Sequence, residues 1–274
     1  MAGIIAAPRY VAGWPLCCQQ ERVSLHKSPD TTSTQVSELL YGEAVTCFDV
    51  RGGWAWVKGR HDDYVGYAPA TALAPVDDPL AAPTHRLAAR HSHRYRAADV
   101  KAPIIGALHA GSPLRLTGQS ADGGFFALAE GGWVPARHVT PWAAINTDLA
   151  ANAALYLGAP YRWGGRSPAG VDCSGLVQMA LRAAGLACPR DSDQQAHVLG
   201  RDLGTDIGVL ERGDLVFFPG HVGIMVDRDH IIHANASEMA VSIDPLTTVL
   251  ETVTKAQPKP PLRALKRLDQ SIAP

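Results

Sequence analysis

The sequence predicts an α+β domain preceded by two small β-barrels. Short strands punctuated by glycine fill residues 1–140, and one strand-and-turn pattern recurs within them. After Trp142 a helical pattern is followed by a meander of strands, which is typical of an α+β domain. The chain has 274 residues, enough for two or three domains. We place these domains at residues 1–76, 85–141 and 143–274.

Composition and charge limit the function classes. Hydrophobic residues make up 46% of the chain and charged residues 19%, which favours a packed core over disorder. The net charge of −1 lacks the basic surplus of nucleic-acid-binding domains. No apolar run reaches the roughly 18 residues of a membrane span. We therefore expect neither a nucleic-acid partner nor a membrane span.

The N-terminus and the cysteines bear on the compartment. The first residues lack a basic start and carry an early proline and arginine, so they make a poor signal peptide. The odd number of cysteines and the absence of a CxxC pair do not indicate a disulfide framework. We expect reduced thiols in a cytoplasmic protein, or a periplasmic or secreted one if a signal peptide has been removed. The five cysteines are Cys17, Cys18, Cys47, Cys173 and Cys188.

The two barrels are predicted from a repeated pattern. In the first, Gly52-Gly53 separates a strand ending near Phe48 from Trp54–Lys58, which alternates at period 2. Tyr67–Leu73 then matches Trp133–Val139 position by position, each with an aromatic strand end, a proline and a short turn ending in an aliphatic residue. Residues 77–83, rich in proline and alanine, are the predicted linker.

Two helices and three strands are predicted in the C-terminal domain. Residues 148–157 and 173–184 have apolar side chains at helical spacing, and Gly185 stands where a helix C-terminal cap belongs. Residues 215–218, 222–226 and 231–234 are apolar runs separated by turn residues, which predicts consecutive strands.

Cys173 is the candidate nucleophile because it opens the second predicted helix. Helix N-termini stabilise anions, so we expect the Cys173 thiol to have a lowered pKa, with Asp172 as N-cap. The alternative is that Cys173 is simply a small buried apolar residue. Asp172 likewise has a purely structural alternative as a helix cap.

A thiol nucleophile needs a base, and the base needs an orienting partner. His221 opens the second predicted strand and His233 lies near the end of the third. The two share a face only if the hairpin has an odd loop count or a bulge, and the sequence leaves that register open. Zinc is the rival use of these residues, but they lack the paired ligand spacing of structural zinc sites. We expect no metal and no cofactor.

Six short segments between residues 161 and 234 carry a family resemblance. Together they resemble the NlpC-type family of cell-wall cysteine peptidases, and they occur in the expected order. The segments are YRWGG at 161–165, GVDCSGLV at 170–177, PRDSDQQ at 189–195, RGDLVFF at 212–218, HVGI at 221–224 and IHA at 232–234.

The resemblance implies a papain-like fold for the C-terminal domain and SH3-like folds for the two barrels. By this resemblance Cys173 is the nucleophile, His221 the base and His233 the third polar member of the site. Tyr161 would support the oxyanion together with the backbone N–H of Cys173. Tyr161 as a mere packing residue is the alternative.

Members with two N-terminal SH3-like modules resemble γ-D-glutamyl-L-diamino-acid peptidases, which cut murein peptides that have a free N-terminal L-Ala. The resemblance implies a carboxylate pocket for the cationic amine, formed by residues beside the nucleophile. It also implies that an acid and a tyrosine of the first barrel close this pocket. The implied substrate-binding residues are Asp172, Ser174, Ser192, Trp163, Glu43 and Tyr64.

Two other functions remain open from the sequence. The chain would be an exported general murein endopeptidase if a signal peptide were removed and the groove were open. It would be a wall-peptide-binding protein without activity if the barrels only held ligands. The intact set of Cys173, His221 and His233 argues against the second. The expected partners are murein peptides such as L-Ala-γ-D-Glu-diaminopimelate.

Overall fold

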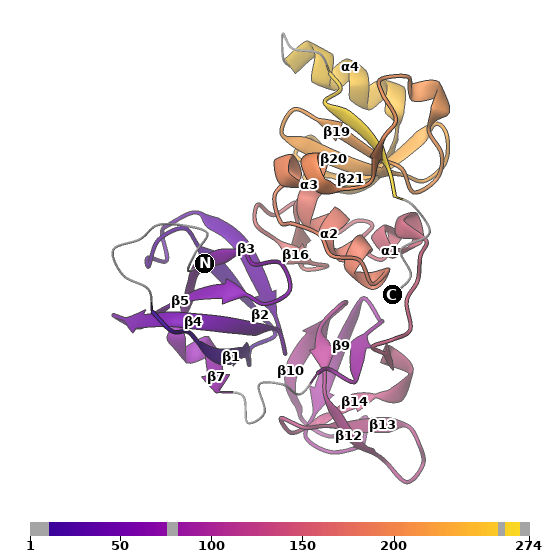
Figure 1. The fold of residues 1–274 in the computed structure, drawn as a ribbon. Coiled ribbons are helices and arrows are strands. Elements are labelled where there is room, and N and C mark those ends of the chain that lie inside the picture. Colours follow the sequence, from indigo (N-terminus) through magenta and orange to yellow (C-terminus); the bar gives the residue numbers. More distant parts are fainter. Residues whose placement is uncertain (1–10, 76–81, 257–260, 269–274) are drawn as a thin grey trace.

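The computed structural model describes residues 11–75, 82–256 and 261–268, and it arranges them in three groups of elements (Figure 1). Two groups are made of strands, and the third combines helices with a sheet. Most of the predicted linker, residues 77–81, lies outside the described residues.

The first group is a seven-stranded antiparallel sheet in the order β3-β2-β6-β5-β4-β1-β7. Gly52 and Gly53, both at positive φ, turn the chain between β4 and β5, as their sequence predicted. Alternate side chains face a core that contains Leu25, Val45 and Val57. The strands are β1 (Trp14–Cys18), β2 (Arg22–His26), β3 (Gln35–Leu40), β4 (Ala44–Arg51), β5 (Trp54–Gly59), β6 (Val65–Pro69) and β7 (Leu73–Pro75).

The second group repeats the closing unit of the first. In both, a strand ends on a proline, Pro69 or Pro135, and a 3-10 turn leads into a short strand that begins at Leu73 or Val139. Its two sheets have the orders β10-β9-β14-β13-β12 and β11-β8-β15. The strands are β8 (His85–Leu87), β9 (His91–Tyr95), β10 (Ile104–His109), β11 (Pro113–Leu114), β12 (Leu116–Gln119), β13 (Phe125–Leu128), β14 (Trp133–Pro135) and β15 (Val139–Pro141).

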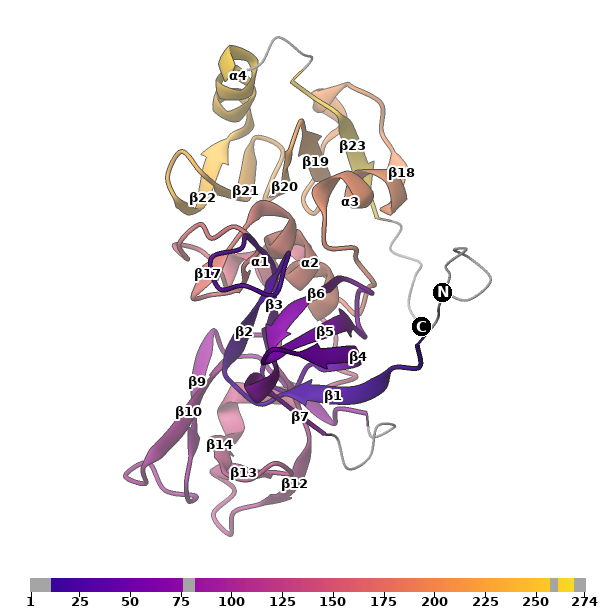
Figure 2. The same cartoon turned by 90° about the vertical axis from the view of Figure 1, so that its left-hand side faces the viewer.

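The third group is built on a six-stranded sheet in the order β18-β23-β19-β20-β21-β22 (Figure 2). The three predicted strands are its centre, and residues 192–198 and 246–256 add helices that the sequence did not predict. Its helices are α1 (Leu149–Ala154), α2 (Cys173–Ala183), α3 (Ser192–Val198) and α4 (Leu246–Ala256). Its strands are β18 (Arg201–Asp202), β19 (Leu215–Phe218), β20 (His221–Met225), β21 (His230–Asn235), β22 (Ala240–Pro245) and β23 (Ala264–Arg267), beside a separate hairpin of β16 (Arg166–Ser167) and β17 (Gly170–Val171).

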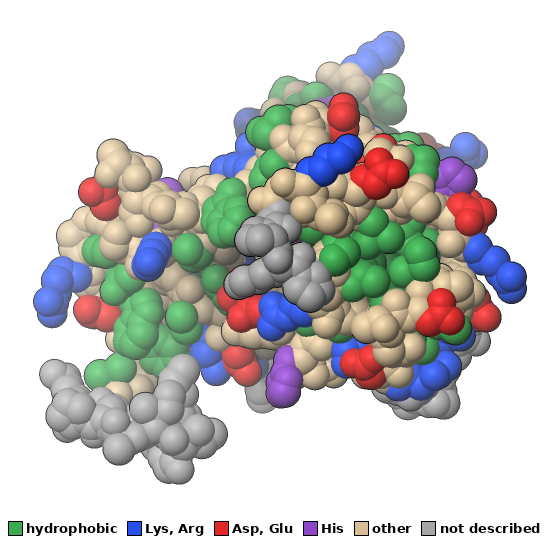
Figure 3. Space-filling model, turned by 90° about the horizontal axis from the view of Figure 1, so that it is seen from above, with side chains coloured by type: hydrophobic (Ala, Val, Ile, Leu, Met, Phe, Trp, Pro, Cys, Tyr) green, Lys and Arg blue, Asp and Glu red, His purple; other side chains and the backbone are tan. Residues whose placement is uncertain are grey.

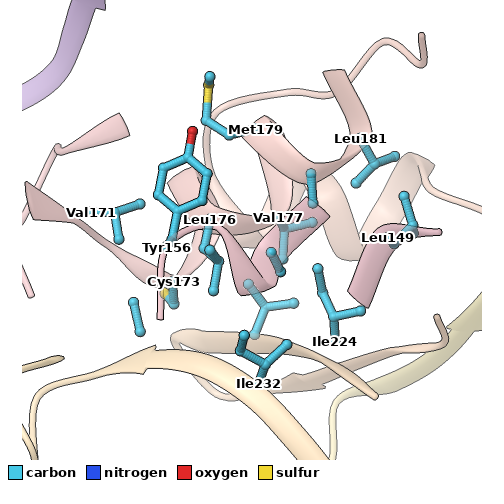
Figure 4. Packing of buried hydrophobic residues seen from close by; sticks show 14 of the residues in the cluster. Leu149, Tyr156, Val171, Cys173, Leu176, Val177, Met179, Leu181, Ile224 and Ile232 are labelled. Atoms are coloured by element: carbon cyan, nitrogen blue, oxygen red, sulfur yellow. The ribbon is translucent and has the colours of Figure 1, made fainter. Parts of the chain in front are cut away.

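Each face of this sheet is covered by a helix. On one face, side chains of α1 and α2 pack with Val222, Ile224 and Ile232 (Figure 4). On the other, Met225 and Ile231 pack with α4. The alternation along β20 therefore separates two hydrophobic layers, and it points every second residue of the strand toward the start of α2.

Helix α2 has defined ends. The Asp172 side chain accepts from the Gly175 N–H at 2.8 Å and so caps the N-terminus. At the other end Gly185 has φ +76°, and the N–H groups of Gly185 and Leu186 donate to the Arg182 and Leu181 carbonyls. This is the predicted glycine cap, closed as a Schellman motif.

Buried ion pairs join the first barrel to the third group. The Glu43 carboxylate accepts from Arg166 at 2.8 and 3.2 Å and also pairs with Arg182, and Glu43 and Arg166 are almost completely buried. Burial by itself would raise the pKa of Glu43, but the charge of Arg166, with those of His61 and Arg182, keeps that pKa well below its usual range. The barrel is therefore fixed against the middle of α2 rather than tethered loosely.

The surface shows mixed charge. Acidic and basic side chains are interspersed on the face drawn in Figure 3. Among the described residues, no helix is long and apolar enough to span a membrane.

We predict that Glu43→Gln destabilises the fold by about 3–5 kcal/mol, because it leaves the Arg166 guanidinium buried without its countercharge. Urea denaturation of the two proteins measures the difference. Glu251→Gln on the exposed surface of α4 is the matched control and should change the free energy of unfolding by less than about 0.5 kcal/mol. Equal stability of Glu43→Gln and wild type would contradict a structural role for this pair.

Candidate active site

Cys173 is the first residue of α2, and its side chain is buried against the sheet (Figure 4). Backbone groups of Val222 and Ser174 hydrogen-bond to the thiol, so Cys173 lies beside the start of β20. Burial raises the pKa of Cys173 to about 11, and the Asp172 charge adds to this effect. The expected lowering of this pKa is wrong, because loss of solvation outweighs the favourable helix terminus. The resting group is a neutral thiol.

His221, the first residue of β20, starts a chain of hydrogen bonds. Its Nε2 lies 2.7 Å from Nδ1 of His233, and Nε2 of His233 lies 3.0 Å from a carboxylate oxygen of Asp244. Ser242 donates to that same oxygen, and Asn235 donates to the Ser242 hydroxyl at 2.8 Å. Three neighbouring strands thus contribute to one polar network.

The hairpin register answers the question that the sequence left open. Ile224 pairs with Ile232 and Met225 with Ile231, and the Val226 N–H donates to the His230 carbonyl. The loop is therefore three residues long, an odd number, and both histidines lie on the same face of the sheet, the one that carries Met225 and Ile231 and is covered by α4. Gly223 lies between them, where an added Cβ would come within 3.0 Å of the His233 Cβ and closer still to Ile231. Only glycine leaves room for the two rings to meet.

The Asp244 carboxylate determines where the protons are. An ionised carboxylate only accepts, so Nε2 of His233 must carry a proton. Neutral His233 then accepts at Nδ1, and Nε2 of His221 must donate to it. This leaves Nδ1 of His221 with a free lone pair. Burial and the neighbouring His233 lower the pKa of His221 to about 3, so the ring is neutral and able to act as a base.

Asp172 and Ser174 lie beside the thiol, but both are occupied by the protein. Asp172 accepts from the N–H groups of Gly164 and Gly175 at 2.7 and 2.8 Å and from Arg190 through both oxygens, at 2.6 and 2.9 Å. Arg190 also donates to the Ser174 hydroxyl at 2.8 Å. A carboxylate has about four acceptor positions, so Asp172 has none left for a substrate amine. The expectation that Asp172 pairs with the amine is therefore not supported.

Glu43 does not reach the thiol either. Its carboxylate is the buried partner of Arg166 and Arg182, and Arg166 contacts α2 at Gln178 and Met179, well past the helix start. The expectation that Glu43 closes an amine pocket is corrected, because both of its oxygens are already used.

The remaining predicted residues gather around the start of α2. The Tyr64 hydroxyl, from the first barrel, donates to Asp191 at 3.2 Å, and Ser192 follows as the first residue of α3. Trp163 is 62% exposed on the loop whose next residue, Gly164, donates to Asp172. Tyr161 is half-buried near Cys173, and burial raises the pKa of its hydroxyl to about 12, so that it remains a donor.

Sequence reasoning missed three functional candidates. Arg190 and Asp191 lie in the segment PRDSDQQ at 189–195, but no role was assigned to them from the sequence. Their opposite charges next to Ser192 could have indicated a role in the site. Asp244 had a weaker signal, the alternation of Val241-Ser242-Ile243-Asp244, which puts both polar side chains on one face of a strand.

A buried cysteine at a helix start, beside a strand that begins with a histidine, is the arrangement of papain-like cysteine peptidases. Residues 158–255 match the family model of the NlpC/P60 family, and residues 25–73 match that of the bacterial dipeptidyl-peptidase Sh3 domain. The chain therefore carries an NlpC/P60 cysteine-peptidase domain and an N-terminal SH3-like domain.

Known relatives span most of the chain. Dipeptidyl-peptidase 6 of Lysinibacillus sphaericus is 28% identical over 81% of this chain and 88% of its own length. Gamma-D-glutamyl-L-lysine dipeptidyl-peptidase of Bacillus cereus is 26% identical over 77% of this chain and 71% of its own. The crystal structure of an NlpC/P60 family protein from Bacillus cereus has a TM-score of 0.77 at 20% identity, covering 92% of this chain and 99% of that one, and shows the same fold.

We predict that Asp244→Ala lowers kcat by roughly 10- to 100-fold with little change in KM, because His233 loses the acceptor that fixes its tautomer. Asp244→Asn should restore part of the rate, since an amide oxygen still accepts. The exposed pair of Asp227 and His230 provides the matched control, and Asp227→Ala should leave kcat unchanged. An unaltered kcat in Asp244→Ala would show that His221 does not depend on this network.

Proposed function

We propose that the enzyme hydrolyses the γ-D-glutamyl-L-diamino acid bond of murein peptides that carry a free N-terminal L-Ala, as in the recycling of wall peptides. The observation that carries this proposal is Asp191. This half-buried carboxylate lies at the start of α3 beside Arg190, its only side-chain hydrogen bond among the described residues comes from Tyr64, and it has no ion-pair partner among them.

Asp191 can take the role that the sequence gave to Asp172 and Glu43. Burial raises the pKa of Asp191, and a cation placed beside this carboxylate would favour its charged form. The neighbouring Asp172 and Arg190 already neutralise each other. Asp191 is therefore the nearby carboxylate that has no ion-pair partner among the described residues. The first barrel supplies Tyr64, whose hydroxyl donates to Asp191, so a residue of the barrel stands beside the proposed amine site.

The chemistry proceeds through a thioester. The Cys173 sulfur attacks the γ-carbonyl carbon as its proton passes to Nδ1 of His221, and the carbonyl oxygen becomes an oxyanion. The Tyr161 hydroxyl and the Cys173 backbone N–H are the donors for that oxyanion. His221 then gives its proton to the leaving nitrogen, and the C–N bond breaks. Water, deprotonated by His221, hydrolyses the thioester and restores the thiol.

The extent of the similarity supports the same choice. The two relatives named as dipeptidyl-peptidases match 81% and 77% of the chain, which is more than the peptidase domain alone, and residues 25–73 match the bacterial dipeptidyl-peptidase Sh3 domain. A probable endopeptidase of Mycobacterium bovis, by contrast, is similar over 37% of the chain.

We predict that Cys173→Ala abolishes release of the diamino acid from L-Ala-γ-D-Glu-L-Lys and from its diaminopimelate counterpart, as followed by mass spectrometry. Cys188→Ala removes another buried thiol and is the matched control, which should keep its turnover. Turnover by correctly folded Cys173→Ala would remove the assigned nucleophile.

We predict that N-acetylation of the L-Ala lowers kcat/KM by about 10- to 100-fold, because hydrogen bonds to charged groups contribute about 1.5–3 kcal/mol. Asp191→Asn should lower kcat/KM for the free peptide. It should also reduce the ratio of kcat/KM for the free peptide to kcat/KM for the N-acetylated peptide. Asp193→Asn, two residues along α3 and exposed, is the control. Equal kcat/KM values for free and blocked peptides in the wild type would leave a general endopeptidase.

A further inference from the structure

A cavity adjoins the catalytic histidines, between the sheet and α4. Its volume is about 330 Å³, within the roughly 300–1,000 Å³ range of small-molecule sites. Tyr161, His221 and His233 form its inner wall, and α4 forms the outer one with Thr248 and Thr252. No residue of the first barrel or of the segment 190–192 is among its described lining residues.

The position of His221 identifies the side of the scissile bond. The base that takes the thiol proton must return it to the leaving nitrogen, so the leaving residue departs past His221. Asp191 and Tyr64, which the proposed function assigns to the N-terminal part of the substrate, are not among the described lining residues of the cavity. The cavity is therefore the place for the side chain of the leaving diamino acid.

The cavity is acidic. Its described lining includes Glu238 and Asp244 but no lysine or arginine, and both histidines are held neutral by burial. Asp244 already accepts from His233 and Ser242, whereas Glu238 has no ion-pair partner among the described residues. Glu238 is thus the carboxylate available to a ligand.

The turn that carries Glu238 is fixed in place. The Glu238 N–H donates to the Asn235 side chain at 2.7 Å, and the carbonyl of Met239 accepts from the Tyr161 N–H at 2.8 Å. On the facing helix, Val249 and Val253 add apolar surface to the lining. A methylene chain can lie on these valines while a terminal ammonium approaches Glu238.

We propose that this cavity binds the side chain of the leaving residue and that Glu238 makes it select L-lysine over meso-diaminopimelate. This inference rests on the proposed γ-D-glutamyl peptidase function. Lysine presents an ammonium alone, which Glu238 can pair with. Diaminopimelate adds a carboxylate at the same carbon, and that group would face Glu238 and Asp244 with no cation among the described lining residues.

The test compares three peptides, L-Ala-γ-D-Glu followed by L-lysine, meso-diaminopimelate or L-norleucine, which has a similar length but no amine. We expect the wild type to prefer lysine to each of the others by about three- to five-fold in kcat/KM, the size of a partly exposed ion pair. Glu238→Gln should remove the preference for lysine over norleucine, and Glu238→Lys should shift the preference toward diaminopimelate. Glu251→Gln, on α4 but outside the cavity lining, is the control and should keep the wild-type ratios.

The experiment distinguishes failure of the proposed role of Glu238 from failure of the proposed peptidase function. If the wild type cleaves all three peptides with equal kcat/KM, or if Glu238→Gln keeps the lysine preference, the role of Glu238 is overturned while the peptidase function stands. If none of the three is cleaved, the γ-D-glutamyl peptidase function itself is overturned and this inference falls with it.

Discussion

The ion pair between Asp172 and Arg190 is the contact on which the rest of the site depends. Through it and its hydrogen bonds, one carboxylate ties together the start of α2, the loop that carries Tyr161 and Trp163, and the segment leading into α3. Burying both charges is costly, and only the dense set of donors around Asp172 offsets this cost. Cys173 is consequently held in place by these contacts, and both oxygens of Asp172 are already occupied by protein donors.

The two carboxylates Asp191 and Asp244 have different roles in this account. Asp191, beside Tyr64 of the first barrel, has no ion-pair partner among the described residues, and we propose it as the place for the substrate's cation. Asp244 acts at a distance, since its charge sets the tautomers of His233 and His221 without touching the thiol. Burial keeps both Cys173 and His221 neutral at rest, so in the proposed mechanism their proton transfer accompanies the attack on the substrate rather than preceding it.

Local signals in the sequence were enough to predict much of the frame. The cap residue Asp172, the glycine after α2 and the repeated proline turns of the barrels act over a few residues, and they have the predicted structure. The register of the hairpin between β20 and β21 depends on the length of one loop. The sequence indicated the approximate position of that loop but not its exact length.

Long-range pairing could not be predicted in the same way. Glu43 was assigned to the substrate by resemblance, yet its partners Arg166 and Arg182 are more than a hundred positions away, and only the docking of the barrel brings them together. The predicted lowering of the Cys173 pKa was wrong for a related reason. The burial of the thiol against β20 cannot be predicted from the sequence around α2. Asp244 was not predicted, because the alternation of polar residues in β22 does not indicate that His233 is its partner.

The central claim is that Cys173 is served by a neutral His221 whose free nitrogen is Nδ1. Nitrogen-15 NMR of the imidazole rings at pH 7 tests it directly, with His221→Gln and His233→Gln variants assigning the signals. The account predicts that both rings are neutral and protonated at Nε2. A proton on Nδ1 of His221, or a doubly protonated His221 ring in the resting enzyme, would contradict it.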